Sequence, residues 1–136
     1  MSSYISKLVR SLVIERAGNR CEYCRIPQAV TNYEFHIEHV IGIQHGGSNS
    51  PENLAWCCAF CNWKKGPNLG TLLDTNTEIV PLFNPRTQNW FDHFEAKNGT
   101  VIPKTTIGKA TVKLLEFNLA ERIEVRAVLT LARFYP

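Results

Sequence analysis

The stretch of sequence that decides the fold is residues 21–66, which read CEYCRIPQAVTNYEFHIEHVIGIQHGGSNSPENLAWCCAFCNWKKG. Cysteines at C-x-x-C spacing lie near both of its ends, as the pairs Cys21/Cys24 and Cys58/Cys61. Two such pairs, brought together, supply the four thiolates of a tetrahedral zinc site. Four thiolates leave no open coordination position, so we expect one structural Zn²⁺ per chain.

The cysteine count argues against a disulfide framework. The sequence has five cysteines, an odd number, and its N-terminus lacks the pattern of a secretory signal. Redox C-x-x-C pairs or unrelated buried thiols are the alternative interpretation of the four paired cysteines. We expect the fifth, Cys57, simply to pack inside the protein, because free cysteine behaves as a small hydrophobic residue.

Length and composition bound the class of protein. The 136 residues are 44% hydrophobic and 20% charged, which is typical of one globular domain, so we expect a single domain over 1–136. The longest apolar runs are too short to cross a bilayer, which predicts a cytoplasmic location and no membrane partner. The net charge of +3 is small, so a polyanion would be bound by locally placed charges.

Periodicity and turn residues predict the elements around the cysteine pairs. We expect a helix over 3–17, a β-branched and aromatic strand over 33–41, and a second short strand over 53–57. A glycine-rich loop separates the two strands. A short helix over 58–65 then begins at the second cysteine pair and ends at Gly66.

The second half, residues 67–136, predicts a hairpin and two helices. Asn98-Gly99 is a strong hairpin turn signal between 90–96 and 100–102. We expect short extended segments at 79–80 and 82–83 and a helix over 109–117 that is capped by Thr105 or Thr106.

A final helix is expected over 119–134, with Ile123, Ala127 and Leu131 on its buried face. Its other face carries three arginines at spacings of four and seven, namely Arg122, Arg126 and Arg133. We interpret this face as solvated, and a phosphate-binding ridge is the alternative. Trp56, Trp63 and Trp90 are expected to pack rather than to stack on bases.

Residues between and just after the cysteine pairs could carry chemistry. Glu38 and Asn62 offer hard oxygen ligands that suit Mg²⁺ or Mn²⁺. His39 is a base with a pKa near the working pH. Lys64 and Lys65 add positive charge for a phosphate. A metal, a base and a phosphate-binding surface are the parts that phosphodiester hydrolysis needs.

Strand geometry sets a condition on this site. On a regular strand Glu38 and His39 point to opposite faces. Both can serve one site only if the strand ends, twists or bulges there. His36 would share a face with Glu38, where it could approach the metal or a phosphate, or act as a hydrogen-bonding tether.

Residues 18–66 resemble an HNH endonuclease with its ββα-metal core. The resemblance lies in the two cysteine pairs, in the run FHIEHVI and in the run HGGSNSPENL. It also includes spacing, with fourteen positions from His39 to Asn53 and nine from Asn53 to Asn62. It implies an α+β fold whose core is stapled by zinc, with an N-terminal helix, a hairpin and C-terminal helices outside the core.

The resemblance also implies roles. His39 would be the general base that activates water, and Asn53 would hold the loop that positions it. Glu38 and Asn62 would hold the catalytic divalent ion, while the four paired cysteines clamp the core. His45, Lys64 and Lys65 are the candidate contacts to DNA; exposure to solvent alone is the alternative for each.

The implied activity is hydrolysis of double-stranded DNA to 5′-phosphate and 3′-hydroxyl ends. A catalytically silent, zinc-stabilised module that binds nucleic acid is the main alternative. A structural zinc protein that binds a protein partner through residues 67–136 is the third interpretation.

Overall fold

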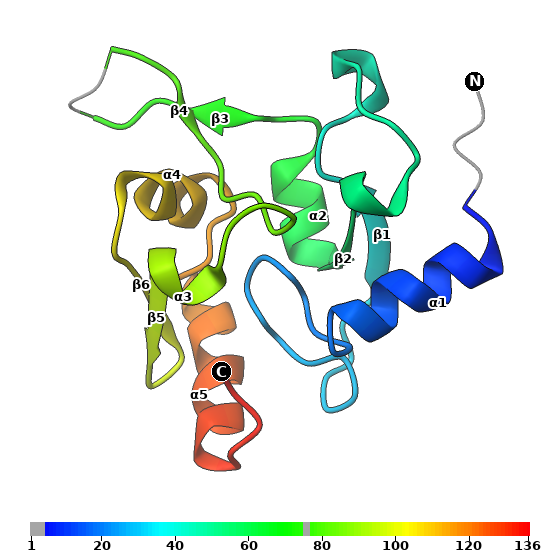
Figure 1. The fold of residues 1–136 in the computed structure, drawn as a ribbon. Helices are drawn as coiled ribbons and strands as arrows, with labels where there is room; N and C mark the ends of the chain where they lie inside the picture. The colour runs from blue at the N-terminus through cyan, green and yellow to red at the C-terminus, as the bar shows by residue number, and fades with distance from the viewer. Residues whose placement is uncertain (1–4, 75–76) are drawn as a thin grey trace.

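The computed structural model describes residues 5–74 and 77–136 and has a mixed α+β fold (Figure 1). The first half contains helix α1 (Lys7–Arg16), strands β1 (Phe35–His39) and β2 (Leu54–Cys58), and helix α2 (Ala59–Lys65). Two 3₁₀ turns, Ile43–His45 and Pro51–Asn53, lie in the long β1–β2 connection. The strand, loop, strand and helix predicted between the cysteine pairs are all present.

Helix α1 is shorter than the predicted 3–17. It begins after Ser6, whose Oγ accepts a hydrogen bond of 3.2 Å from the amide of Val9. Such a side-chain cap satisfies one of the free amides of the first turn. Residues 3 and 4 of the predicted helix lie outside the described residues.

Strands β1 and β2 form an antiparallel pair with Phe35 opposite Cys58 and His39 opposite Leu54. Every residue of β2 is buried. Helix α2 continues directly from β2 and packs against both strands. The end of β1 therefore lies beside the beginning of β2.

The second half contains small sheets and helices (Figure 1). Strand β3 (Gly70–Thr71) pairs with β4 (Val80–Pro81), and β5 (Phe94–Lys97) pairs with β6 (Thr100–Pro103). The β5–β6 turn contains Asn98 and Gly99, both with positive φ, as the hairpin prediction requires.

Helices in the second half depart from the predicted ranges. The segment expected to begin the hairpin is first a short helix, α3 (Trp90–His93), capped by Asn89. Helix α4 (Thr106–Leu114) starts at the predicted Thr105 cap, whose Oγ1 accepts from Gly108. Helix α5 spans Ala120–Leu131 rather than 119–134.

The predicted orientation of the last helix was wrong. Arg122 and Arg126 are 2% and 1% exposed, whereas Leu131 is 87% exposed. The two guanidinium groups can be buried because backbone carbonyls accept hydrogen bonds from them. Arg126, for example, donates to the carbonyls of Gly99 and Phe117, both at 2.6 Å. Arg133 is exposed, as expected.

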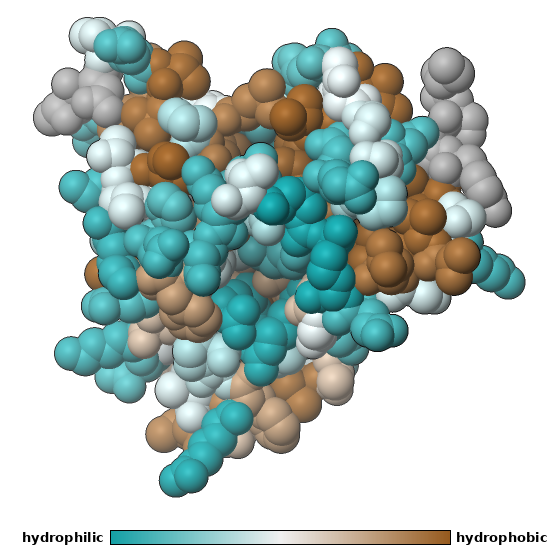
Figure 2. Space-filling view, viewed as in Figure 1, coloured by the Kyte–Doolittle hydropathy of each residue, from teal (hydrophilic) through white to brown (hydrophobic). Residues whose placement is uncertain are grey.

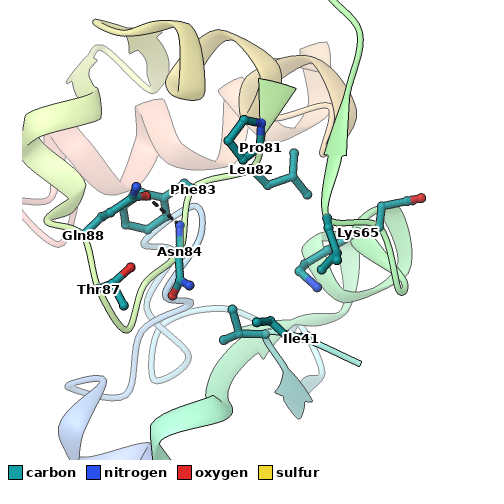
Figure 3. A pocket seen from close by; sticks show the side chains of 11 residues that line it. Ile41, Lys65, Pro81, Leu82, Phe83, Asn84, Thr87 and Gln88 are labelled. Carbon is teal, nitrogen blue, oxygen red and sulfur yellow. Dashed lines mark hydrogen bonds between the residues drawn. The ribbon is translucent and has the colours of Figure 1, made fainter. Parts of the chain in front are cut away.

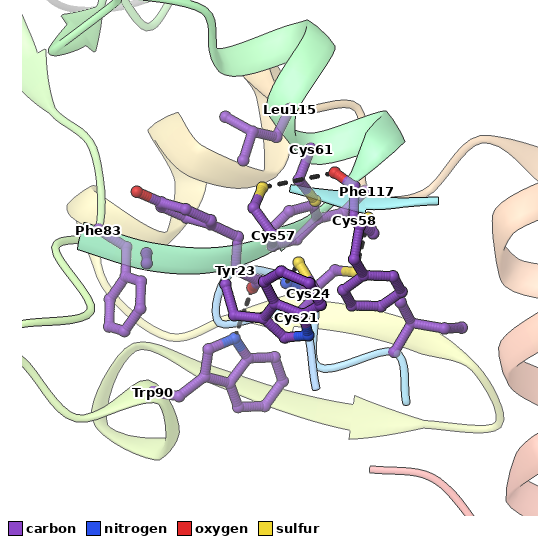
Figure 4. Packing of buried hydrophobic residues seen from close by; sticks show 14 of the residues in the cluster. Cys21, Tyr23, Cys24, Cys57, Cys58, Cys61, Phe83, Trp90, Leu115 and Phe117 are labelled. Atoms are coloured by element: carbon purple, nitrogen blue, oxygen red, sulfur yellow. Dashed lines mark hydrogen bonds between the residues drawn. The ribbon is translucent and has the colours of Figure 1, made fainter. Parts of the chain in front are cut away.

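One continuous buried cluster includes residues from both halves and surrounds the cysteines (Figure 4). Trp56 and Trp90 belong to it, as predicted. Trp63 does not: it is 81% exposed on α2, which corrects the expectation that it packs. Within residues 5–74 and 77–136, no helix is long and apolar enough to span a membrane.

Candidate metal centre and nuclease site

The four paired cysteines form one cluster. Their sulfur atoms all lie within 4.8 Å of one another, and all four residues are buried: Cys21, Cys24, Cys58 and Cys61. Cys24 Sγ and Cys58 Sγ are 3.8 Å apart. Zinc–sulfur bonds of about 2.3 Å in a tetrahedron place the sulfurs about 3.8 Å apart, so the cluster fits Zn²⁺. In the described part of the chain, this is the only such group of three or more histidine, cysteine or acidic side chains.

Cys57 lies next to the cluster in sequence but is not one of its four cysteines. Alternation along β2 directs neighbouring side chains to opposite faces, so Cys57 and Cys58 diverge. The thiol of Cys57 is buried and lies 3.4 Å from the carbonyl oxygen of Cys58. Burial raises the pKa of the Cys57 thiol well above its usual value. The residue therefore packs as a neutral thiol, as predicted.

Arg122 of α5 reaches the cysteine cluster from the second half of the chain. Its Nη2 donates to Cys61 Sγ at 3.1 Å, and Nη1 donates to the carbonyl of Leu115 at 2.7 Å. Burial lowers the pKa of Arg122, but the thiolates of Cys61, Cys24 and Cys58 raise it by more, so the guanidinium is charged. Helical spacing singled out this arginine but predicted the wrong face for it.

Asn53 fastens the loop that follows β1. Its Oδ1 accepts from the amide of Ile41 at 2.9 Å, and its Nδ2 donates to the carbonyls of Ile41 and Ser48, both at 2.8 Å. Gly47 lies in the same turn, where a Cβ would be 1.7 Å from the Ile41 oxygen. The side-chain amide of Asn53 thus holds the two ends of the loop together, and only glycine fits at position 47.

His39 is the last residue of β1, which is shorter than the predicted strand over 33–41 at both ends. Its Nε2 lies 2.7 Å from the Oδ1 of Asn49. An amide oxygen only accepts, so Nε2 carries a proton and Nδ1 of the neutral ring is the acceptor. Asn49 was not among the predicted site residues, because no spacing rule distinguishes it from the other polar residues of the loop.

Glu38 is buried, with 6% of its surface exposed. Its Oε1 accepts from the hydroxyl of Tyr23 at 3.3 Å, and its Oε2 lies 3.5 Å from Nζ of Lys65. Burial raises the pKa of Glu38 to about 7, although Lys65 and Tyr23 act in the opposite direction. Among the residues that the structure describes, Oε2 has no hydrogen-bond partner. The ammonium of Lys65 is the cation that the structure places beside this oxygen.

The two lysines of α2 differ in position. Lys65 is 2% exposed and its ammonium faces Glu38 and the carbonyl of His39, so the expected contact between Lys65 and DNA does not fit the structure. Lys64 is partly exposed and pairs with Glu116 at 2.7 Å. Asn62 is half-buried, three residues before Lys65 and hence on the same side of the helix.

Within the described ranges, His36 and His45 make no hydrogen bond or ion pair with Glu38, and they differ in their surroundings. His36 is half-exposed, and its Nε2 lies 3.4 Å from Oε1 of Glu34. His45 is exposed in the first 3₁₀ turn. Glu38 and His39 are the last two residues of β1, Asn53 immediately precedes β2, and His45 is exposed.

Comparison with known proteins gives one family match, which covers this part of the chain. Residues 21–68 match the family model of the HNH endonucleases. The match runs from the first cysteine pair to just beyond α2. No curated protein and no solved structure gives a significant match to the chain.

Proposed function

We propose that the protein is a metal-dependent DNA endonuclease. The observation that carries this proposal is the set of three hydrogen bonds that the Asn53 side chain makes, two as donor and one as acceptor, inside the segment that matches the HNH endonucleases. They hold the loop after His39, whose Nε2 is fixed by Asn49. A hydrolase needs a base held in one orientation, and a protein that only binds DNA does not.

His39 is the general base in this proposal. With Nε2–H donated to Asn49, Nδ1 accepts a proton from a water molecule. The water oxygen then bonds to phosphorus as the bond to the 3′ oxygen breaks. The leaving 3′ oxygen takes up a proton from solvent water, and the protonated His39 returns its proton to solvent, which gives 5′-phosphate and 3′-hydroxyl ends.

Glu38 and Asn62 would hold the catalytic divalent ion. The buried Oε2 of Glu38, which lacks a hydrogen-bond partner among the described residues, fits a cation, and an amide oxygen suits Mg²⁺ or Mn²⁺. When bound, such an ion stabilises the charge that develops on the phosphate and on the leaving oxygen. The zinc of the four cysteines, by contrast, would have no open position and would hold the core together.

Contacts to double-stranded DNA would come from exposed groups near this site. Lys64 can exchange its partner Glu116 for a phosphate because the ion pair between them is partly exposed. His45, exposed in the loop, is the second contact. Lys65 would act within the protein instead, by keeping the carboxylate of Glu38 ionised.

The ion pair between Lys65 and Glu38 also favours a second candidate. An ammonium group 3.5 Å from Oε2 already supplies a cation to the carboxylate. A chain that retained this pair permanently would be a zinc-stabilised module that binds nucleic acid without cutting it.

Cleavage of supercoiled plasmid distinguishes the two functions. The zinc-loaded protein is incubated with plasmid and either Mg²⁺ or Mn²⁺, and the ends are tested by ligation and by polymerase extension. Nicked or linear DNA whose ends can be ligated and extended supports the endonuclease. Intact plasmid that nevertheless shifts in a gel supports the binding module.

A further inference from the structure

Four arginines from three separate segments line two neighbouring hollows on the surface. Arg16 ends α1, Arg20 and Arg25 flank the first cysteine pair, and Arg86 lies in the loop between β4 and α3. The first three line a cavity of about 160 Å³, and Arg16 also lines a neighbouring pocket with Arg86. Figure 2 shows that the centre of this face, where the β4–α3 loop crosses in Figure 1, is hydrophilic.

Positive charge exceeds negative charge in this arginine cluster. Of the described side chains, only two carboxylates, Glu22 and Glu52, line the same two pockets, so four arginines leave a formal charge of +2. The pKa of Arg16 is lowered by burial and by the nearby Arg86, and that of Arg25 by burial and by Arg20. Like charges are therefore crowded together, which an anion would relieve.

Several donors of the cluster also lack acceptors. Arg86 donates from Nη2 to Glu22, but its buried Nε and Nη1 have no hydrogen-bond partner within the described ranges. The same holds for Nε of Arg25, whose guanidinium lies over the rings of Trp90 and Phe91. A guanidinium presents its donors in a planar fork that matches the oxygens of a phosphate.

The cluster lies beside the nuclease site. Nη2 of Arg16 donates to the carbonyl of Leu54 at 2.8 Å, and Leu54 pairs with His39 across the two strands. Thr87 and Gln88, which line the arginine pockets, also line a third cavity of about 270 Å³ (Figure 3). Lys65 and Ile41 face them across that cavity in Figure 3. One continuous surface thus connects the arginines with the end of β1.

We propose that Arg16, Arg20, Arg25 and Arg86 form a second phosphate-binding site, which holds a backbone phosphate of the DNA away from the bond that is cut. The choice of DNA as the source of the phosphate rests on the proposed function. The site adds contacts to the DNA from α1 and from the β4–α3 loop, both of which lie outside residues 21–68. It reads charge rather than sequence, because only the backbone is touched.

DNA binding without cleavage tests this site independently of catalysis. Binding of a fluorescein-labelled 20-base-pair duplex is measured without Mg²⁺ or Mn²⁺, over a range of salt concentrations. The variants are the double substitution Arg16→Gln/Arg25→Gln and its charge-retaining counterpart Arg16→Lys/Arg25→Lys. Lys97→Gln and Lys109→Gln, both exposed and in the second half, are combined as the control that removes the same charge. Zinc content and melting temperature are checked for each.

The glutamine pair is expected to weaken binding roughly tenfold at low salt and to reduce the salt slope by about 1 to 2, as loss of phosphate contacts does. The lysine pair should recover most of the affinity, and the control should change it less than threefold. Equal effects of the glutamine pair and the control would overturn the site. The site would also be overturned if inorganic phosphate bound at the cluster but the substitutions left binding of the duplex unchanged. If the arginine substitutions weaken DNA binding but the wild type does not cleave DNA, the phosphate-binding site is supported and the endonuclease proposal is refuted.

Discussion

The guanidinium of Arg122, on the last helix, donates a hydrogen bond of 3.1 Å to the sulfur of Cys61, the last of the four clustered cysteines. Residues 61 positions apart are thereby joined inside the core. Four thiolates around Zn²⁺ carry a net charge of −2, and a buried cation offsets part of it. Hydrogen bonds to ligand atoms also tune metal affinity. Helix α5 is accordingly part of the surroundings of the four-cysteine cluster.

Arg122→Met should therefore loosen the metal. We expect zinc affinity to fall between 10- and 100-fold, which is typical when a group that supports a metal ligand is lost. Release of zinc to a coloured chelator and the melting temperature measure the effect. Arg133→Met, which removes an exposed arginine just beyond α5, is the matched control. Zinc release at the wild-type rate in Arg122→Met would contradict this role.

Asn53→Ala should separate catalysis from DNA binding. The substitution removes three hydrogen bonds that hold the loop after His39, which costs about 1–3 kcal/mol of stability in total because part of this loop is open to water. We expect cleavage to fall about 100-fold while the dissociation constant for DNA changes less than threefold. Asn53→Asp keeps only the acceptor and should give an intermediate rate. Equal losses of binding and cleavage would show that the loop serves binding alone.

Two glycines of the same loop should respond differently to alanine. In Gly47→Ala the new Cβ would be 1.7 Å from the oxygen of Ile41, so the turn must open. In Gly42→Ala the nearest atoms are 3.9 Å away and φ is −61°, so the methyl group fits. We expect Gly47→Ala to lose about 1–3 kcal/mol of stability and Gly42→Ala less than about 0.5 kcal/mol, in chemical denaturation. Equal losses would contradict the close approach of Gly47 to the Ile41 carbonyl and to Asn53.

Glu38→Gln should abolish cleavage, and its stability relative to the wild type should rise with pH. The pKa of Glu38 in the folded state is about 7, above its ordinary value of 4.5. Below pH 4.5 the carboxyl is neutral in both the folded and unfolded states; as the pH rises through 7, folding must bury a charge and stability is lost. The loss reaches up to about 3 kcal/mol. Glutamine avoids it.

Melting temperatures at about pH 5 and about pH 8, without added Mg²⁺ or Mn²⁺, measure this effect. The melting temperature of Glu38→Gln minus that of the wild type should be larger at about pH 8 than at about pH 5. A difference that stays constant or narrows would show that Lys65 fully compensates the buried charge. Plasmid cleavage by the same variant provides the functional half of the comparison.

The core could be predicted from sequence because its determinants are local. Cysteine spacing, β-branched runs and Gly66 mark the strand, loop, strand and helix, and the cysteine pairs predict their own cluster. The details of the site depend on contacts between distant residues. No local pattern shows that Lys65 turns inward to Glu38, or that Asn49 would hold His39.

The last helix shows the limit of periodicity most clearly. An arginine stripe at helical spacing ordinarily faces water, since burying a charge is costly. Here Arg122 finds thiolates and carbonyls, and Arg126 finds the carbonyls of Gly99 and Phe117. Those acceptors come from other segments, so a pattern within the helix could not reveal them.

The central claim is that His39 is the base of a DNA endonuclease. It is tested most directly by plasmid cleavage with Mg²⁺ or Mn²⁺, comparing wild type with His39→Ala at equal zinc content and equal melting temperature. His36→Ala, on the same strand, is the control. We predict cleavage by the wild type, retention in His36→Ala and a loss of at least about 100-fold in His39→Ala. Cleavage by His39→Ala at the wild-type rate would contradict the claim.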